Sequence, residues 1–195
     1  MLLKGAPTDA FQGFTVFSPE HGALLVQQRL SRKATSSVAL DLFDEVSLRL
    51  ESPNQGQTWF VQEARLLARH PDLGRSYETL RHASAVAALV ARNTVHEDSR
   101  AQVAALLRQA FASFAAGARP DLVWFKTLYV FARDEGYPVK QEWLPSLPPP
   151  MRAQAKHFLA TPLASLEMPA TQPQIAVLAQ RLADYLRGHS DILVE

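Results

Sequence analysis

Residues 59–91 read WFVQEARLLARHPDLGRSYETLRHASAVAALVA, and the hydrophobic period changes in the middle of this stretch. A strand-like run opens at Trp59 and continues towards Arg65. Residues 70–72, His-Pro-Asp, interrupt that run with turn-forming residues. Beyond this break, apolar and small residues recur at helical spacing, on a face made of Tyr77, Leu80, Ser84, Ala87 and Ala91. The change predicts strands before about residue 70 and helices after it.

The first seventy residues carry further strand patterns. Residues 40–51 alternate, mostly, between apolar and polar side chains, which is the period of a half-buried strand. Turn-forming clusters at residues 18–22 and 52–56 separate the apolar runs. Several consecutive strands with polar turns predict a small antiparallel barrel or sheet.

Most of the remaining sequence has helical patterns, interrupted by one proline-rich segment. Residues 103–114 place apolar side chains on one broad stripe, and Gly117 follows as a stop signal. Asp121 is a candidate N-cap for the next helix. Residues 144–150, Leu-Pro-Ser-Leu-Pro-Pro-Pro, predict a stiff extended connector. Strands first and helices second is the α+β order, which divides the chain into residues 1–70 and 71–195.

Composition excludes several classes of protein. The chain has 195 residues and no cysteine, so disulfides, thiol catalysis and cysteine-based zinc sites are excluded. Its net charge of +1 excludes a highly basic nucleic-acid wrapper but leaves room for a local basic patch. No apolar run approaches the roughly 20 residues that span a bilayer. Residues 1–4 are too short for the core of a signal peptide, so we expect neither secretion nor a membrane anchor.

The motifs of common enzymes are missing from the sequence. None of the six histidines forms a pair at the i, i+4 spacing of a helical metal site. No Gly-x-Ser-x-Gly elbow and no phosphate-binding glycine loop is present. Asp44 and Glu45 are adjacent on a predicted strand and therefore point to opposite faces, so we expect a solvated strand edge and one turn-facing residue there. We do not expect an enzyme.

A binding surface remains as the candidate for function. Arg29, Arg32 and Lys33 cluster within a few residues, and Lys4 is a further basic residue of the same region. A basic loop on a strand scaffold can follow a phosphate backbone, with aromatic side chains as stacking platforms. Trp59 is the aromatic residue expected to be partly exposed. The alternative interpretation of the three clustered charges is a plain solvated loop.

The order of these segments resembles the bacterial DNA repair protein family RecO, which comprises recombination mediators. Residues 17–26, FSPEHGALLV, are similar to that family's F-T/S-P-E-x-G turn between early strands. Residues 29–33 fall where RecO proteins carry their basic loop. Residues 128–138, LYVFARDEGYP, resemble the family's L-L-x-x-x-G-Y-x-P segment.

The resemblance implies an N-terminal OB-fold β-barrel for residues 1–70, followed by a C-terminal α-helical domain. It implies binding of single- and double-stranded DNA, annealing of complementary strands, and no catalytic centre. It also implies RecR and the single-stranded-DNA-binding protein (SSB) as partners, and a place in the bacterial cytoplasm on the nucleoid. The DNA-binding residues would be Lys4, Arg29, Arg32 and Lys33.

The chain departs from the family in two respects. Many RecO proteins carry a four-cysteine zinc module where this chain has residues 139–150, so we expect neither zinc nor another cofactor. The basic loop is also sparse, with serines at positions 36 and 37 where arginine is common in the family. The alternative is therefore a diverged RecO-like protein-interaction module that contacts SSB or RecR and binds DNA weakly or not at all.

That alternative would use the helical domain. Trp124 or Trp143 could line a groove for a partner peptide, although the position of Trp124 on an amphipathic helix favours a place in the helix-packing core. The possible counter-charges for an acidic peptide are Arg81, Arg92, Arg108 and Lys126.

Overall fold

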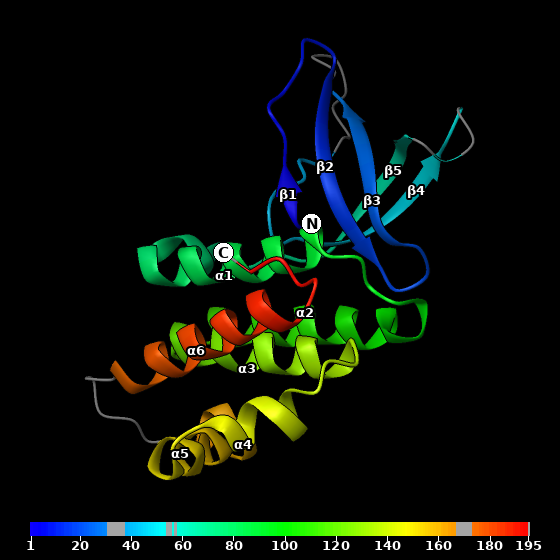
Figure 1. Cartoon of the computed structure of the whole chain (residues 1–195). Helices are drawn as coiled ribbons and strands as arrows, with labels where there is room; N and C mark the ends of the chain where they lie inside the picture. The colour runs from blue at the N-terminus through cyan, green and yellow to red at the C-terminus, as the bar shows by residue number, and fades with distance from the viewer. Residues whose placement is uncertain (31–37, 54–55, 57, 167–172, 195) are drawn as a thin grey trace.

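The computed structural model describes residues 1–30, 38–53, 56, 58–166 and 173–194. A five-stranded sheet lies at one end of a stack of helices (Figure 1). The strands are β1 Leu3–Lys4, β2 Phe11–Ser18, β3 Gly22–Arg29, β4 Glu45–Glu51 and β5 Trp59–Ala68. The predicted order of strands followed by helices is confirmed.

The sheet has the strand order β1-β2-β3-β5-β4. Neighbouring strands are antiparallel except β3 and β5, which run parallel with Val26 opposite Trp59 and Gln27 opposite Phe60. No ladder joins β1 to β4 within the described residues, so the sheet there is open and is not a closed barrel.

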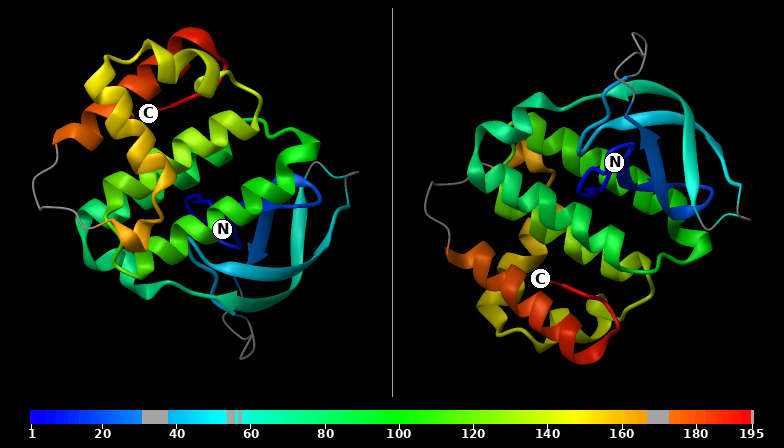
Figure 2. Two further views of the ribbon diagram at one scale, coloured as in Figure 1. Left: turned by 90° about the horizontal axis from the view of Figure 1, so that it is seen from below. Right: turned by 90° about the horizontal axis from the view of Figure 1, so that it is seen from above.

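The principal helices are α1 Tyr77–Arg92, α2 Arg100–Ala115, α3 Pro120–Asp134, α4 Leu144–Ser146, α5 Pro149–Ala160 and α6 Pro173–His189. Single turns of other helix types connect them: η1 Pro71–Arg75, η2 Glu97–Ser99, η3 Val139–Trp143 and η4 Leu163–Ser165. Helix α3 packs against α1, α2 and α6. The two further views show α4 and α5 on the side of the stack away from the sheet (Figure 2).

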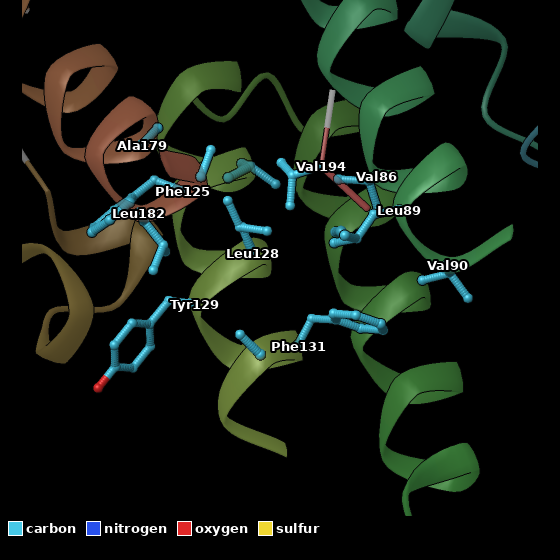
Figure 3. Close-up of a cluster of buried hydrophobic side chains, with 14 of the residues drawn as sticks. Val86, Leu89, Val90, Phe125, Leu128, Tyr129, Phe131, Ala179, Leu182 and Val194 are labelled. Atoms are coloured by element: carbon cyan, nitrogen blue, oxygen red, sulfur yellow. The ribbon is translucent and has the colours of Figure 1, made fainter. Parts of the chain in front are cut away.

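Helix α3 supplies the centre of the hydrophobic core. Phe125, Leu128 and Phe131 are completely buried. Figure 3 shows them between Val86 of α1 and Leu182 of α6. The stripe predicted on α2 is confirmed, because its buried residues are Val103, Ala104, Leu107, Ala110, Phe111 and Phe114.

The sheet and the helices share part of their cores. A smaller cluster within the sheet centres on Phe14, Val16 and Val26. Leu2 and Phe43, in contrast, belong to the main cluster formed by the helices. The first residues of the chain therefore pack against the helical stack, although the division near residue 70 stays a prediction.

The prediction of an extended connector at residues 144–150 is wrong. The turn η3 continues into α4, Leu147 is buried, and Pro149 and Pro150 form the first turn of α5. Proline is tolerated in a first turn because its missing N–H would have no helical partner there. The Arg152 guanidinium donates to the carbonyl of Leu147 at 2.9 Å and also to that of Pro145, which fixes the bend.

Helix α1 buries a face that shares only Ala87, among its buried residues, with the predicted one. Tyr77 is 76% exposed and Leu80 is 39% exposed, whereas His82, Val86 and Leu89 are buried. Alanine occurs all around this helix, and a small apolar side chain fits a buried or an exposed position equally well. The spacing of the alanines therefore did not determine which face packs.

The start of α3 also differs from the prediction. The helix begins at Pro120, and Asp121 lies in its first turn rather than at the N-cap. There the Asp121 carboxylate accepts from the backbone N–H of Leu122 at 2.8 Å and pairs with Arg119 at 2.7 Å. A carboxylate in the first turn is favourable because it faces the positive end of the helix dipole.

The end of the described chain docks on the helical stack. Ile192 and Val194 are buried, while Leu193 between them is 61% exposed. The Asn93 side chain donates to the Leu193 carbonyl at 3.1 Å and accepts from the Leu193 N–H at 2.8 Å. In the described ranges, no helix is long and apolar enough to cross a membrane.

Candidate nucleic-acid interface

One face of the sheet, which we call the outer face, carries a mixture of apolar, polar and basic side chains. Cross-strand partners lie on the same side of a sheet, and the register pairs Phe11 with Arg29, Thr15 with Leu25, and Gln27 with Phe60. The outer face therefore includes Phe11, Gly13, Thr15, Leu25, Gln27, Arg29 and Phe60, and the exposed Glu51 of β4 lies beside Phe60 on the same side.

The outer face presents two aromatic rings. Phe11 and Phe60 are both half-buried, and their ring centroids lie 5.5 Å apart in an edge-to-face arrangement. Leu25 on the adjacent strand is 51% exposed. Partly exposed aromatic rings on a sheet are the type of platform on which unpaired bases stack.

A cavity of about 580 Å³, which we call the outer cavity, adjoins these rings. Phe11, Leu25 and Gln27 line it from the sheet, Lys4 and Gly5 from the chain around β1, and Ser84 from α1. The buried Gln12 side chain holds the segment between β1 and β2, because its amide donates to the Gly5 carbonyl at 2.6 Å.

Gly13 lines the outer cavity, and its lack of a side chain leaves room for the Gln27 side chain above it. A Cβ atom at this position would lie 3.3 Å from the Gln27 side-chain amide, which covers the glycine. A residue with a Cβ atom would require the Gln27 amide to move by a few tenths of an ångström. The amide of Gln27 thus lies directly on the backbone of β2, where it can meet a polar group of a ligand.

The predicted DNA-binding residues are only partly brought together. Arg29 is exposed at the end of β3, on the outer face and opposite Phe11. Lys4 lines the outer cavity, but its ammonium pairs with the Asp41 carboxylate at 3.1 Å. Arg32 and Lys33 lie outside the described residues.

The expectation of a solvated strand edge and one turn-facing residue at positions 44 and 45 is wrong for Asp44, which is buried. Its side chain is 1% exposed, and both of its carboxylate oxygens bind the Arg69 guanidinium. It also accepts from the backbone N–H of Asp41 at 2.9 Å. The partner lies 25 positions away on the chain after β5, and periodicity cannot reveal such a pair.

A second cavity, the inner cavity, lies between the opposite face of the sheet and α2. It encloses about 430 Å³, and apolar side chains such as Leu48, Trp59 and Phe111 line much of it. The prediction that Trp59 is partly exposed is confirmed, since it is half-buried. At the rim, the Glu45 carboxylate lies 3.5 Å from the Arg108 guanidinium.

The N-terminal amine lies at the same end of the inner cavity. It donates to the Asp44 carbonyl at 2.7 Å. Burial lowers the pKa of the Met1 amine to about 6, and the negative charges of Asp44 and Glu45 act in the opposite direction. No sequence pattern singles out this group.

Of the tryptophans proposed for a peptide groove, Trp143 is buried and Trp124 is half-buried. Trp143 is 2% exposed and packs against the rings of Phe125 and Tyr129, with centroids 6.2 Å and 6.0 Å away. Trp124 is half-buried against the main core, as its alternative interpretation predicts.

The proposed counter-charges of the helical part have partners within the fold. The Lys126 ammonium donates to the carbonyls of Phe158 and Thr161, at 2.9 Å and 2.6 Å, and its burial lowers the pKa of Lys126. This cation stabilises the carboxyl end of α5. Arg81 pairs with Glu78 at 3.0 Å, and Arg108 pairs with Glu45 as described above.

Across the described residues, no group of three or more histidine and acidic side chains is close enough together to hold a metal ion. Neither a known protein family nor a curated protein matches the chain. The function proposed below therefore rests on the geometry of the sheet.

Proposed function

We propose that this protein binds single-stranded DNA through the outer face of its sheet and acts, like RecO, as a non-catalytic mediator of strand annealing in recombinational repair. The observation that supports this most directly is the Phe11–Phe60 ring pair beside the exposed Arg29. Bases would stack on the rings while the guanidinium binds phosphate.

The strand order supports the same proposal. OB-folds are five-stranded, partly open barrels that bind oligonucleotides on the face of their second and third strands. Here five strands form an open sheet in the order β1-β2-β3-β5-β4, and the outer face lies on β2 and β3, with Phe60 added from β5. We interpret the open sheet as a divergent OB-fold.

The wider role is proposed with it. A RecO-like mediator would also bind double-stranded DNA, would contact RecR and SSB, and would work on the nucleoid in the cytoplasm. Because phosphate contacts carry no base information, we expect binding with little sequence preference and with affinity that falls steeply with salt.

A fluorescence-anisotropy titration of labelled oligo-dT at low and moderate salt tests the proposal. Phe60→Ala removes a stacking ring, which is worth roughly 1–3 kcal/mol per base, so affinity should fall about ten-fold. The combined change Arg29→Ala, Arg32→Ala and Lys33→Ala should weaken binding further and flatten its salt dependence. Arg181→Ala, an exposed arginine on α6 in the stack below the sheet, is the matched control (Figure 1).

Absence of binding at low salt, or equal loss in the Arg181→Ala control, would overturn the proposal. The protein-interaction alternative would then lead, with SSB or RecR as the partner. The observation that favours it is the Lys4–Asp41 ion pair, which neutralises a cation beside the outer cavity. Capture of purified SSB or RecR by the protein without DNA would support it.

A further inference from the structure

Strand β4 leaves one edge of the sheet unpaired. β4 is bonded to β5 on one side, and the described residues place no strand on its other side. Ser47, Arg49 and Glu51 of this strand are exposed. An edge of this kind presents a row of backbone N–H and C=O groups that can pair with another strand.

The sequence of β4 is complementary to itself in the antiparallel direction. Residues 45–49 read Glu-Val-Ser-Leu-Arg. If a second copy of the strand pairs antiparallel about Ser47, Glu45 lies opposite Arg49 at both ends. Val46 lies opposite Leu48, and Ser47 lies opposite its own copy. A two-fold axis requires this type of self-complementary patch.

Neighbouring registers are less favourable. Centring the pair on Leu48 places Glu45 opposite Glu51, and centring it on Arg49 places two guanidinium groups opposite each other. Like charges directly opposite each other destabilise a strand pair. Charge therefore favours the register about Ser47 over these two, and a pair centred on Val46 would set Glu45 opposite Ser47 and form no ion pair.

Within the chain, Arg49 and Glu45 each form only a weak ion pair. The Arg49–Glu63 pair spans 3.2 Å between side chains that are 74% and 72% exposed. The Glu45–Arg108 pair spans 3.5 Å. Exposed ion pairs of this kind contribute little to stability, so they do not compete strongly with pairing across an axis.

We propose that β4 is an interface for a second copy of this chain, and that two sheets join edge to edge about Ser47. Joining places Val46 and Leu48 of both copies side by side near the mouths of the two inner cavities. It also turns the two outer faces into one continuous surface.

Cysteine cross-linking tests the register directly, because the chain contains no cysteine of its own. In the proposed register the Cα atoms of the two Ser47 residues lie about 4.5–5.5 Å apart, within the range of a disulfide. Ser47→Cys should therefore form a covalent dimer under mild oxidation. The matched control, Glu51→Cys, lies on the same strand but would sit roughly 27 Å from its copy, so it should stay monomeric.

A charge swap tests the same interface without cross-linking. Sedimentation equilibrium of the wild type should show a concentration-dependent rise from 21.6 kDa towards twice that mass. Glu45→Arg and Arg49→Glu should each abolish this rise, because each places like charges at both ends of the pair. The double variant should restore it. The control is Lys140→Glu, an exposed lysine in η3.

The double swap separates the interface from a structural role within the chain. It worsens both intrachain pairs, because Glu45→Arg sets a second guanidinium against Arg108, and Arg49→Glu sets a second carboxylate against Glu63. The double variant restores opposite charges only between the two copies of β4. A monomer at every concentration, a dimer insensitive to both single changes, or equal cross-linking at positions 47 and 51 would overturn the proposal.

Discussion

The Arg69 guanidinium binds both oxygens of the Asp44 carboxylate, at 2.8 Å from Nε to Oδ1 and 2.5 Å from Nη2 to Oδ2. Asp44 precedes β4, and Arg69 follows β5. The pair therefore links the two strands at the end of the β4–β5 hairpin opposite its turn. The hydrogen bond and negative charge of the Asp44 carboxylate raise the pKa of Arg69.

Arg69→Met should lower the melting temperature more than Arg49→Met does. The first change leaves a buried carboxylate without its counter-charge, whereas the second removes an exposed pair with Glu63. Thermal unfolding followed by circular dichroism compares the two variants. Equal melting temperatures would contradict a structural role for the Asp44–Arg69 pair.

Stability should rise between pH 6 and pH 8. The pKa of the Met1 amine is about 6 in the fold against 8.0 in the unfolded chain, so the unfolded state binds more protons in this window. The expected gain on going from pH 6 to pH 8 is roughly 2 kcal/mol, and it is lost again as the pH falls.

Urea unfolding across this range measures the gain. Glu45→Gln should move the pH dependence to lower pH, since the charge of Glu45 raises the pKa of the amine. A stability that does not change between pH 6 and pH 8 would show that the amine is solvated.

Two glycine substitutions should have opposite effects. Gly136 has a φ of +89° after α3, a conformation that costs a residue with a Cβ about 1–2 kcal/mol, so Gly136→Ala should destabilise the fold by that amount. Gly188 lies in the last turn of α6 with open space around it, and Gly188→Ala should stabilise by up to about 1 kcal/mol. Chemical denaturation of both variants checks the signs.

Phe125→Ala should be among the most damaging changes. The ring is 0% exposed at the centre of α3, and loss of such a ring typically costs about 3–5 kcal/mol through lost burial and the cavity left behind. Leu25→Ala is the control, because that side chain is 51% exposed and its loss should cost little. Similar losses for both would contradict the location of the core.

Asp41→Asn should strengthen DNA binding if the outer face is the interface. The change releases Lys4 from its ion pair, while the asparagine oxygen can still accept from the Leu42 N–H. We expect a rise in affinity of about two- to five-fold at low salt, with a steeper salt dependence. Asp72→Asn, which breaks the exposed pair with Arg75, should leave anisotropy titrations unchanged.

The sequence was informative where large apolar side chains repeat. The stripe on α2 contains Leu107, Phe111 and Phe114, which leave one possible buried face, and the prediction was confirmed there. On α1 alanines occur on several sides of the helix and fit any face, so the spacing predicts a face containing Tyr77 and Leu80, which are in fact exposed.

The candidate site was only partly predictable for a different reason. Alternation shows that a strand has two faces, but the register decides which aromatic residues stay accessible. Phe11 and Phe60 come from strands far apart in the chain, and only the parallel placement of β5 beside β3 brings them together. Pairing of Asp44 with Arg69 is similarly a property of the register and not of local spacing.

The parallel contact between β3 and β5 also affects how quickly the sheet can form. The whole of β4 lies between Val26 and Trp59 in the sequence, and Leu2 belongs to a core cluster made mostly of residues beyond position 70. Contacts of such long sequence separation slow folding, because the loop entropy is lost before the contact energy is gained. During synthesis the strands would therefore emerge well before the helical surface that Leu2 packs against. Until the helices fold, the charged side chains at the edge of the sheet would protect the partly folded sheet from aggregation.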